Sequence, residues 1–146
     1  MYIKILHFII SYFDYPNKKK TINFFKEKFE NNISVLIDVG AHHGETIKLF
    51  NDQFKIKSIL SFEPAKKNYE QLLVKNKNLK NVKFFNIGLG EFEKMVDFND
   101  HFETQSSTIS KINFSSKYYK KKNLFLNPLR NRDKKINIVQ IKIRKL

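Results

Sequence analysis

The segment from Asp38 to Thr46 holds residue types that could bind a ligand. Asp38 follows the apolar run 35–37, and glycines stand at positions 40 and 44. A carboxylate accepts hydrogen bonds, and glycines let the backbone turn tightly and let a ligand approach it closely. In open α/β sheets, ligands bind beyond the carboxyl ends of the strands. An acid at the end of a strand, followed by a glycine turn, therefore predicts a ligand-binding loop; the alternative is that Asp38 only caps the turn.

The spacing of the glycines argues against a phosphate ligand. A dinucleotide fingerprint has glycines at its first, third and sixth positions, so that the pyrophosphate can touch the backbone. Here the third position is His42, and the next glycine comes four residues after Gly40. A P-loop needs a lysine after its last glycine, whereas Gly44 is followed by Glu45. A ligand with an amino-acid end and a nucleoside end fits better, because the free N–H groups at the start of the next helix would suit its carboxylate.

A second acid, Glu63, stands 19 residues after Gly44. An acid about 20 residues beyond a glycine turn lies at the end of the next strand and can accept hydrogen bonds from ribose hydroxyls. In that case, Glu63→Ala should weaken nucleoside binding and barely change stability. The alternative is an acid that only faces the dipole of the following helix.

The adjacent histidines 42 and 43 could be metal ligands, which needs a third ligand and converging side chains. We expect adjacent side chains to diverge, and the sequence offers no third ligand at the usual spacing. The prediction is therefore that these are loop residues, one of them near the bound ligand, and that the chain has no metal site.

The elements around these residues predict an α/β fold with a parallel sheet. Short apolar runs alternate with helical patterns and short connections, which is typical of right-handed crossovers. The first strand is mostly apolar and is expected to be buried on both faces. The expected strands are 35–39, 58–62 and 82–87, the expected helices are 45–54 and 65–76, and residues 88–90 are expected to form a turn. Beyond them the pattern indicates strands at 94–98 and 136–143, a loop at 105–110 and an irregular basic stretch at 117–133.

The N-terminal segment carries an apolar run at 3–13, which is too short to span a bilayer because a helix needs about 20 residues. No small-residue cleavage site follows it, so a signal peptide is not expected. We predict a helix over this apolar run, a break at Pro16 and residues 17–20, and a second helix over 21–31. The chain has no cysteine, which excludes a disulfide framework and a thiolate nucleophile. A cytoplasmic protein without a membrane span is therefore expected.

The net charge of +14 invites a nucleic-acid function. The excess is concentrated near the end of the chain, because residues 117–146 hold 11 lysines and arginines against one acid. Arginine suits bidentate contacts to phosphates and bases, and only 3 of the 28 basic residues are arginines. We therefore expect no specific nucleic-acid partner.

Three motifs stand at the ends of the predicted strands: Asp38-Val39-Gly40-Ala41-x-x-Gly44, Ser61-Phe62-Glu63-Pro64 and Asn86-Ile87-Gly88-Leu89-Gly90. Together they resemble the FkbM-type family of class I S-adenosylmethionine-dependent methyltransferases, over roughly residues 33–146. The resemblance implies a Rossmann-like class I methyltransferase sheet that binds S-adenosyl-L-methionine. It implies that Asp38 and the loop Gly40–Gly44, including Ala41 and His42, hold the methionine end. It further implies that Glu63 holds the ribose and that Asn86 and Gly88 lie along the adenine.

The resemblance also implies methyl transfer to a hydroxyl of a small molecule, a sugar or glycan, or a lipid-linked acceptor. In the family, a Leu-Asp pair and an Asp-x-Glu-Gly motif follow the strand that 136–143 resembles, and this chain ends at Leu146 before both. We therefore expect a helical segment over 1–32 and an incomplete methyltransferase domain over 33–146, with no catalytic residue that can be named. A basic nucleic-acid-binding module and a non-catalytic fragment are the alternative functions.

Overall fold

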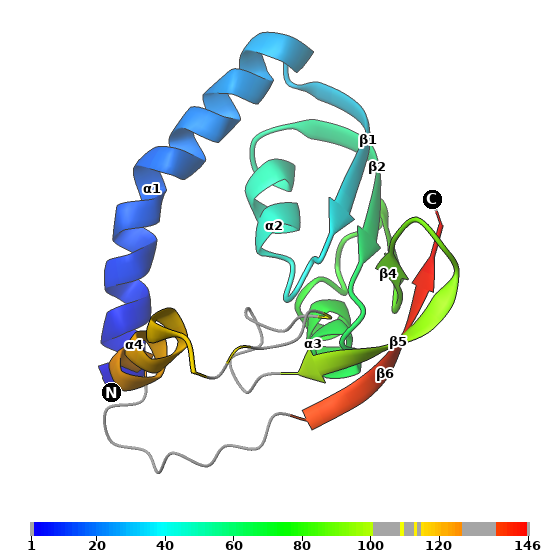
Figure 1. Ribbon diagram of the computed structural model, residues 1–146. Coiled ribbons are helices and arrows are strands. Elements are labelled where there is room, and N and C mark those ends of the chain that lie inside the picture. Colours follow the sequence, from blue (N-terminus) through cyan, green and yellow to red (C-terminus); the bar gives the residue numbers. More distant parts are fainter. Residues whose placement is uncertain (1, 101–108, 110–112, 114, 127–136, 146) are drawn as a thin grey trace. The chain divides into compact units, whose positions relative to one another are not determined.

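The computed structural model describes residues 2–100, 109, 113, 115–126 and 137–145 (Figure 1). The chain divides into two compact units, one comprising Met1–Lys28 and Lys111–Lys135 and the other Phe29–Ser110 and Ile136–Leu146. The described elements of the first unit are helices only, whereas the second unit contains two further helices and all the described strands. None of the described helices combines the length and the apolar character needed to cross a membrane.

Helix α1 (Tyr2–Phe29) corrects the predicted break, because it continues through Pro16. An interior proline removes one backbone hydrogen bond and clashes with the carbonyl four residues back, which favours a break, yet the residues on both sides of Pro16 are helical. Just after it, the Thr21 hydroxyl donates a hydrogen bond to the Asn17 carbonyl, 3.0 Å away and one turn back. The polar stretch 17–20 is therefore helical and is not a linker.

Helix α4 (Lys117–Leu126) corrects the prediction of an irregular basic stretch. The residue that indicates the start of this helix is Ser116, which lies just before it. The Ser116 hydroxyl accepts a hydrogen bond from the Tyr119 N–H at 3.1 Å, which satisfies one of the free donors of the first turn. Residues 127–133 lie outside the described part.

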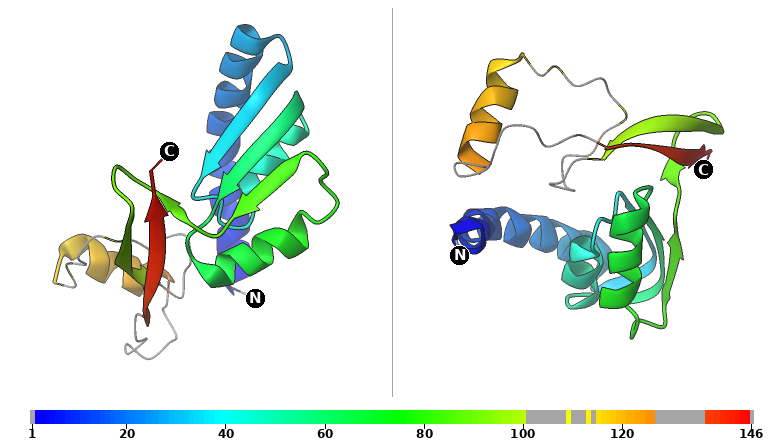
Figure 2. Two further views of the ribbon diagram at one scale, coloured as in Figure 1. Left: turned by 90° about the vertical axis from the view of Figure 1, so that its right-hand side faces the viewer. Right: turned by 90° about the horizontal axis from the view of Figure 1, so that it is seen from below.

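The first sheet contains the three predicted parallel strands in the order β1-β2-β3. Helices α2 and α3 connect them, as expected, so the α/β prediction is confirmed and the arrangement is one part of a Rossmann-like sheet. Figure 2 shows the three strands side by side. The bounds are β1 (Asn32–Val39), α2 (Glu45–Asn51), β2 (Lys55–Phe62), α3 (Lys66–Lys75) and β3 (Val82–Phe85).

The core of this sheet lies on one face, where Ile59 packs with Ile47 of α2 and Leu72 of α3, all fully buried. The opposite face corrects the prediction that the first strand is buried on both sides. There Val35, Ile37 and Val39 are 53%, 46% and 57% exposed. Among the described strands β1 pairs only with β2, so it is an edge strand with one covered face.

A second sheet has the order β4-β6-β5 and is formed by β4 (Gly88–Leu89), β5 (Lys94–Asp100) and β6 (Asn137–Arg144). Strands β5 and β6 match predicted strands, whereas β4 replaces most of the predicted turn. Strand β4 is possible because Gly88 pairs with Ile143 of β6, whose side chain lies where a side chain at position 88 would have to be. The predicted loop at 105–110 lies outside the described residues, except for Ile109.

Candidate ligand-binding site

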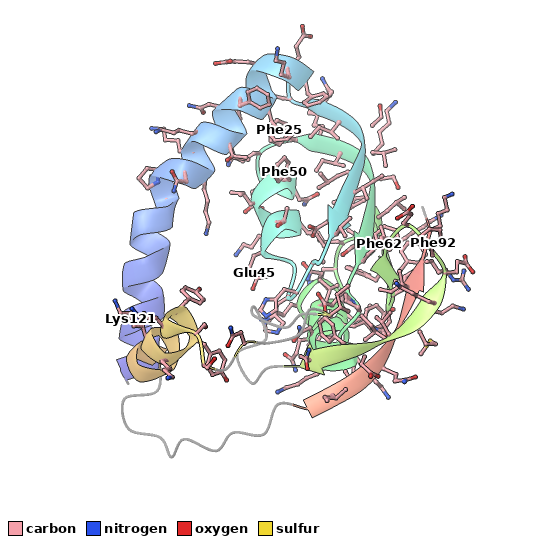
Figure 3. The ribbon with its side chains drawn as sticks, in the orientation of Figure 1. Phe25, Glu45, Phe50, Phe62, Phe92 and Lys121 are labelled. Atoms are coloured by element: carbon pink, nitrogen blue, oxygen red, sulfur yellow. The ribbon has the colours of Figure 1, made fainter. Side chains whose placement is uncertain are left out.

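The candidate site lies at the carboxyl ends of β1 and β2. Figure 3 shows Glu45 at the start of α2 and Phe62 at the end of β2. The loop between β1 and α2 is fixed to β2, because the Phe62 carbonyl accepts hydrogen bonds from the N–H groups of Gly40 and Ala41, at 2.9 and 3.0 Å. The Gly44 N–H in turn donates to the Ala41 carbonyl at 2.8 Å, which closes the turn.

Three residues of this loop have a left-handed backbone, with φ of 78° at Gly40, 50° at His42 and 91° at Gly44. The two glycines have different surroundings. A Cβ at position 44 would meet the side-chain amide of Asn76, so Gly44 permits close packing on α3. A Cβ at position 40 would meet nothing within 4 Å. The backbone at Gly40 therefore borders open space in which a ligand could approach.

Asp38 is buried at the end of β1, with 7% of its surface exposed. Its Oδ2 has no hydrogen-bond partner among the described residues. Burial, together with the negative charges of Glu45 and Glu63, raises the pKa of this carboxyl from its ordinary value of 3.8 to about 6. The paired residue on β2, Ser61, is fully buried and its hydroxyl also lacks a described partner. Buried polar atoms are nearly always paired, so both are candidates for contacts with a ligand.

Glu63 follows β2 and is 4% exposed. Its carboxylate joins two loops: one oxygen accepts the His42 N–H at 2.8 Å, and the other accepts the Ala65 N–H at 2.9 Å. The Ala65 N–H that donates the second bond lies just before α3, so the position of Glu63 also agrees with the alternative of an acid that faces the dipole of that helix. The first bond holds the glycine loop, a role that the sequence did not predict. Each oxygen has a second lone pair, so these bonds leave room for a further donor.

The two histidines do not diverge as expected. Their rings lie 3.7 Å apart between centroids and are tilted by 30°, because the left-handed backbone at His42 turns both side chains to the same side. The Nδ1 atoms of His42 and His43 lie 3.3 and 3.8 Å from Oε1 of Glu45. Burial lowers the pKa of His43, and the charge of His42 lowers it further. Burial would raise the pKa of Glu45, but backbone hydrogen bonds and the charge of His42 outweigh it and lower the pKa.

Asn86 lies beside Glu63, because its side-chain amide donates to the carbonyls of Glu63 and Pro64 at 2.8 and 3.1 Å. Gly88 stands two residues further along the chain and is buried in the second sheet, against Ile143. The structure thus brings Asp38, the loop 40–44, Glu63 and Asn86 to one end of the first sheet. Gly88 has a packing role of its own at the β4–β6 pair.

Sequence reasoning missed the support that Asn76 gives from the end of α3. Its buried side-chain amide donates to the carbonyls of Leu72 and His43, at 2.9 and 3.2 Å, and so fixes the loop 33 residues away. An asparagine at the end of a helix is common, so the sequence carries no signal for this contact. The contribution of Glu45 to the histidine pair was also missed, although its position two residues beyond His43 could have suggested it.

Comparison with known proteins finds a solved structure that resembles part of the chain. No family model and no curated protein matches the chain. A solved structure, the methyltransferase FkbM from Methylobacillus flagellatus KT, matches at 20% identity and a TM-score of 0.39. The match covers 45% of this chain and 20% of that protein, so this chain spans about a fifth of the protein it resembles. A likeness at this level does not extend to function.

Proposed function

We propose that this end of the sheet binds S-adenosyl-L-methionine and that the chain is the cofactor-binding part of a methyltransferase. The observation that carries the proposal is the pairing of an unpartnered buried acceptor, Oδ2 of Asp38, with open space at Gly40. A buried carboxylate without a partner is costly, and a ligand that brings a donor or a positive charge removes that cost. The residues present therefore fit the cofactor.

Charge favours this ligand over nucleotides with phosphate groups. Asp38, Glu45 and Glu63 lie close enough for the latter two to raise the pKa of the first. A phosphate group would be repelled by these carboxylates, whereas the ammonium and sulfonium groups of S-adenosylmethionine would be attracted. NAD and ATP, which are anionic, are accordingly the disfavoured ligands.

The proposed assignment of parts is the one that the family resemblance implies. Asp38 would accept from the ammonium group of the methionine end, and the loop Gly40–Gly44 would follow that end along the backbone. Glu63 would accept from ribose hydroxyls with its remaining lone pairs while it still holds the His42 N–H. Asn86, fixed against the carbonyl of Glu63, would border the adenine.

When bound, the cofactor supplies a methyl group that is already activated by the sulfonium, so the protein contributes mainly binding and orientation. The proposed acceptor is a hydroxyl of a small molecule, a sugar or a lipid-linked glycan, in the cytoplasm. No catalytic base is assigned among the described residues. Transfer can be tested with radiolabelled S-adenosylmethionine and a panel of sugar and small hydroxyl acceptors.

Amide chemical shifts can test the proposed placement without a known acceptor. Titration of ¹⁵N-labelled protein with S-adenosylhomocysteine should shift the amides of the loop 40–44, Glu63 and Asn86, and should leave those of α4 in place. Shifts scattered over the basic helix α4 instead, with none in the loop, would contradict the proposal. A titration with ATP serves as the matched control and should produce no shifts in the loop.

A further inference from the structure

We propose that His42, His43 and Glu45 form a binding site for a divalent late transition metal ion, Zn²⁺ first among them. The ligand atoms of these three residues all lie within 4.8 Å of one another. Two ligands of one tetrahedral zinc ion stand about 3.3 Å apart, given metal–ligand bonds near 2.0–2.1 Å. The distances from Oε1 of Glu45 to the Nδ1 atoms of His42 and His43 are 3.3 and 3.8 Å, so the first pair already has this separation and the second is close to it.

The backbone holds these side chains in place before any metal binds. The His42 N–H donates to Glu63 at 2.8 Å, and the His43 carbonyl accepts from Asn76 at 3.2 Å. The His43 N–H donates to Glu45 Oε2 at 3.2 Å, which ties the third ligand to the second. A loop that is fixed on both sides loses little freedom on binding, which favours affinity.

The donor set selects the class of metal. Two imidazole nitrogens and one carboxylate suit Zn²⁺, Co²⁺, Ni²⁺ or Cu²⁺, whereas Mg²⁺ and Ca²⁺ prefer sites made of oxygen atoms. Three protein ligands leave a fourth tetrahedral position for water or another small oxygen or nitrogen ligand. Both histidines are partly exposed and Glu45 is exposed, so an ion can enter from water.

This inference does not depend on the proposed cofactor, because the metal is titrated alone. Calorimetry with Zn²⁺ should show one site per chain, and His43→Ala and Glu45→Gln should each weaken binding by more than about tenfold. Two controls should bind as the unaltered chain does. Asp52→Asn removes an acid just beyond the other end of α2, and a double variant, His7→Ala with His101→Ala, removes the remaining two of the four histidines.

A measurement on the unaltered chain avoids any effect of the variants on folding. Ring ¹⁵N resonances should show that Zn²⁺ engages Nδ1 of both His42 and His43, and Co²⁺ should give the visible absorption of a four-coordinate site. The proposal is overturned if the ring resonances of His42 and His43 stay in place during the Zn²⁺ titration. It is equally overturned if the double variant abolishes binding while His43→Ala preserves it.

Discussion

Replacing Asp38 by asparagine should remove a loss of folding stability that develops as the pH rises from about 4 to about 6. Burial and the neighbouring carboxylates raise the pKa of Asp38 in the folded chain from 3.8 to about 6. Between these pH values the folded chain holds a proton that the unfolded chain has released, so stability falls as the pH rises and is constant for this group above the folded pKa. Each pKa unit corresponds to roughly 1.4 kcal/mol, so the full effect is about 3 kcal/mol.

Urea unfolding followed by circular dichroism from pH 4 to pH 7 measures this effect. The difference in free energy of unfolding between Asp38→Asn and the unaltered chain should grow by about 2–3 kcal/mol in favour of the variant over that range, since part of the full effect lies below pH 4. Asp52→Asn, which changes an exposed acid at the end of α2, should give a flat difference. A flat difference for Asp38→Asn as well would refute the reasoning that Asp38 is a destabilised acid awaiting a partner.

Three further predictions follow from the site and the charge distribution. Glu63→Ala should lower the free energy of unfolding by about 2–4 kcal/mol, because it leaves two backbone N–H groups without their acceptor; unchanged urea midpoints would contradict this. Gly44→Ala should cost about 2–4 kcal/mol, since its Cβ would displace the Asn76 side chain, whereas Gly40→Ala should cost only the ~1–2 kcal/mol of a left-handed alanine. Nucleic acid should bind residues 117–146 only weakly and without sequence preference, and fluorescence anisotropy should show the binding lost at physiological salt; sub-micromolar binding there would favour a nucleic-acid function.

The convergence of the site could be predicted because the carboxyl ends of parallel strands meet at one edge of a sheet. Asp38 and Glu63 each end a short apolar run, and the glycine turn between them carries its own signal in residue type. That was enough to place both acids and the loop together. The structure nevertheless changes the effect on stability that is expected of Glu63→Ala, because spacing shows where a carboxylate lies and does not show which N–H groups already donate to it.

Other features depend on contacts that no local pattern records. The burial of β1 was predicted from its apolar residues, yet a strand is covered on two faces only when other elements pack there, and Val35 and Ile37 remain exposed. Strand β4 exists because Gly88 meets Ile143, far along the chain. The histidine pair converges because His42 takes a left-handed backbone, which is uncommon for a residue other than glycine.

Oδ2 of Asp38, an unpartnered buried acceptor at the end of β1, is proposed to bind a positively charged nucleoside cofactor. Calorimetry should compare S-adenosylmethionine, NAD and ATP on the unaltered chain and on Asp38→Asn at pH 7.5, above the pKa of Asp38. S-adenosylmethionine should bind more tightly than either nucleotide, and the variant, although more stable, should lose about 1–3 kcal/mol of binding free energy. Tighter binding of NAD than of S-adenosylmethionine, or an affinity for S-adenosylmethionine that Asp38→Asn leaves unchanged, would contradict this proposal.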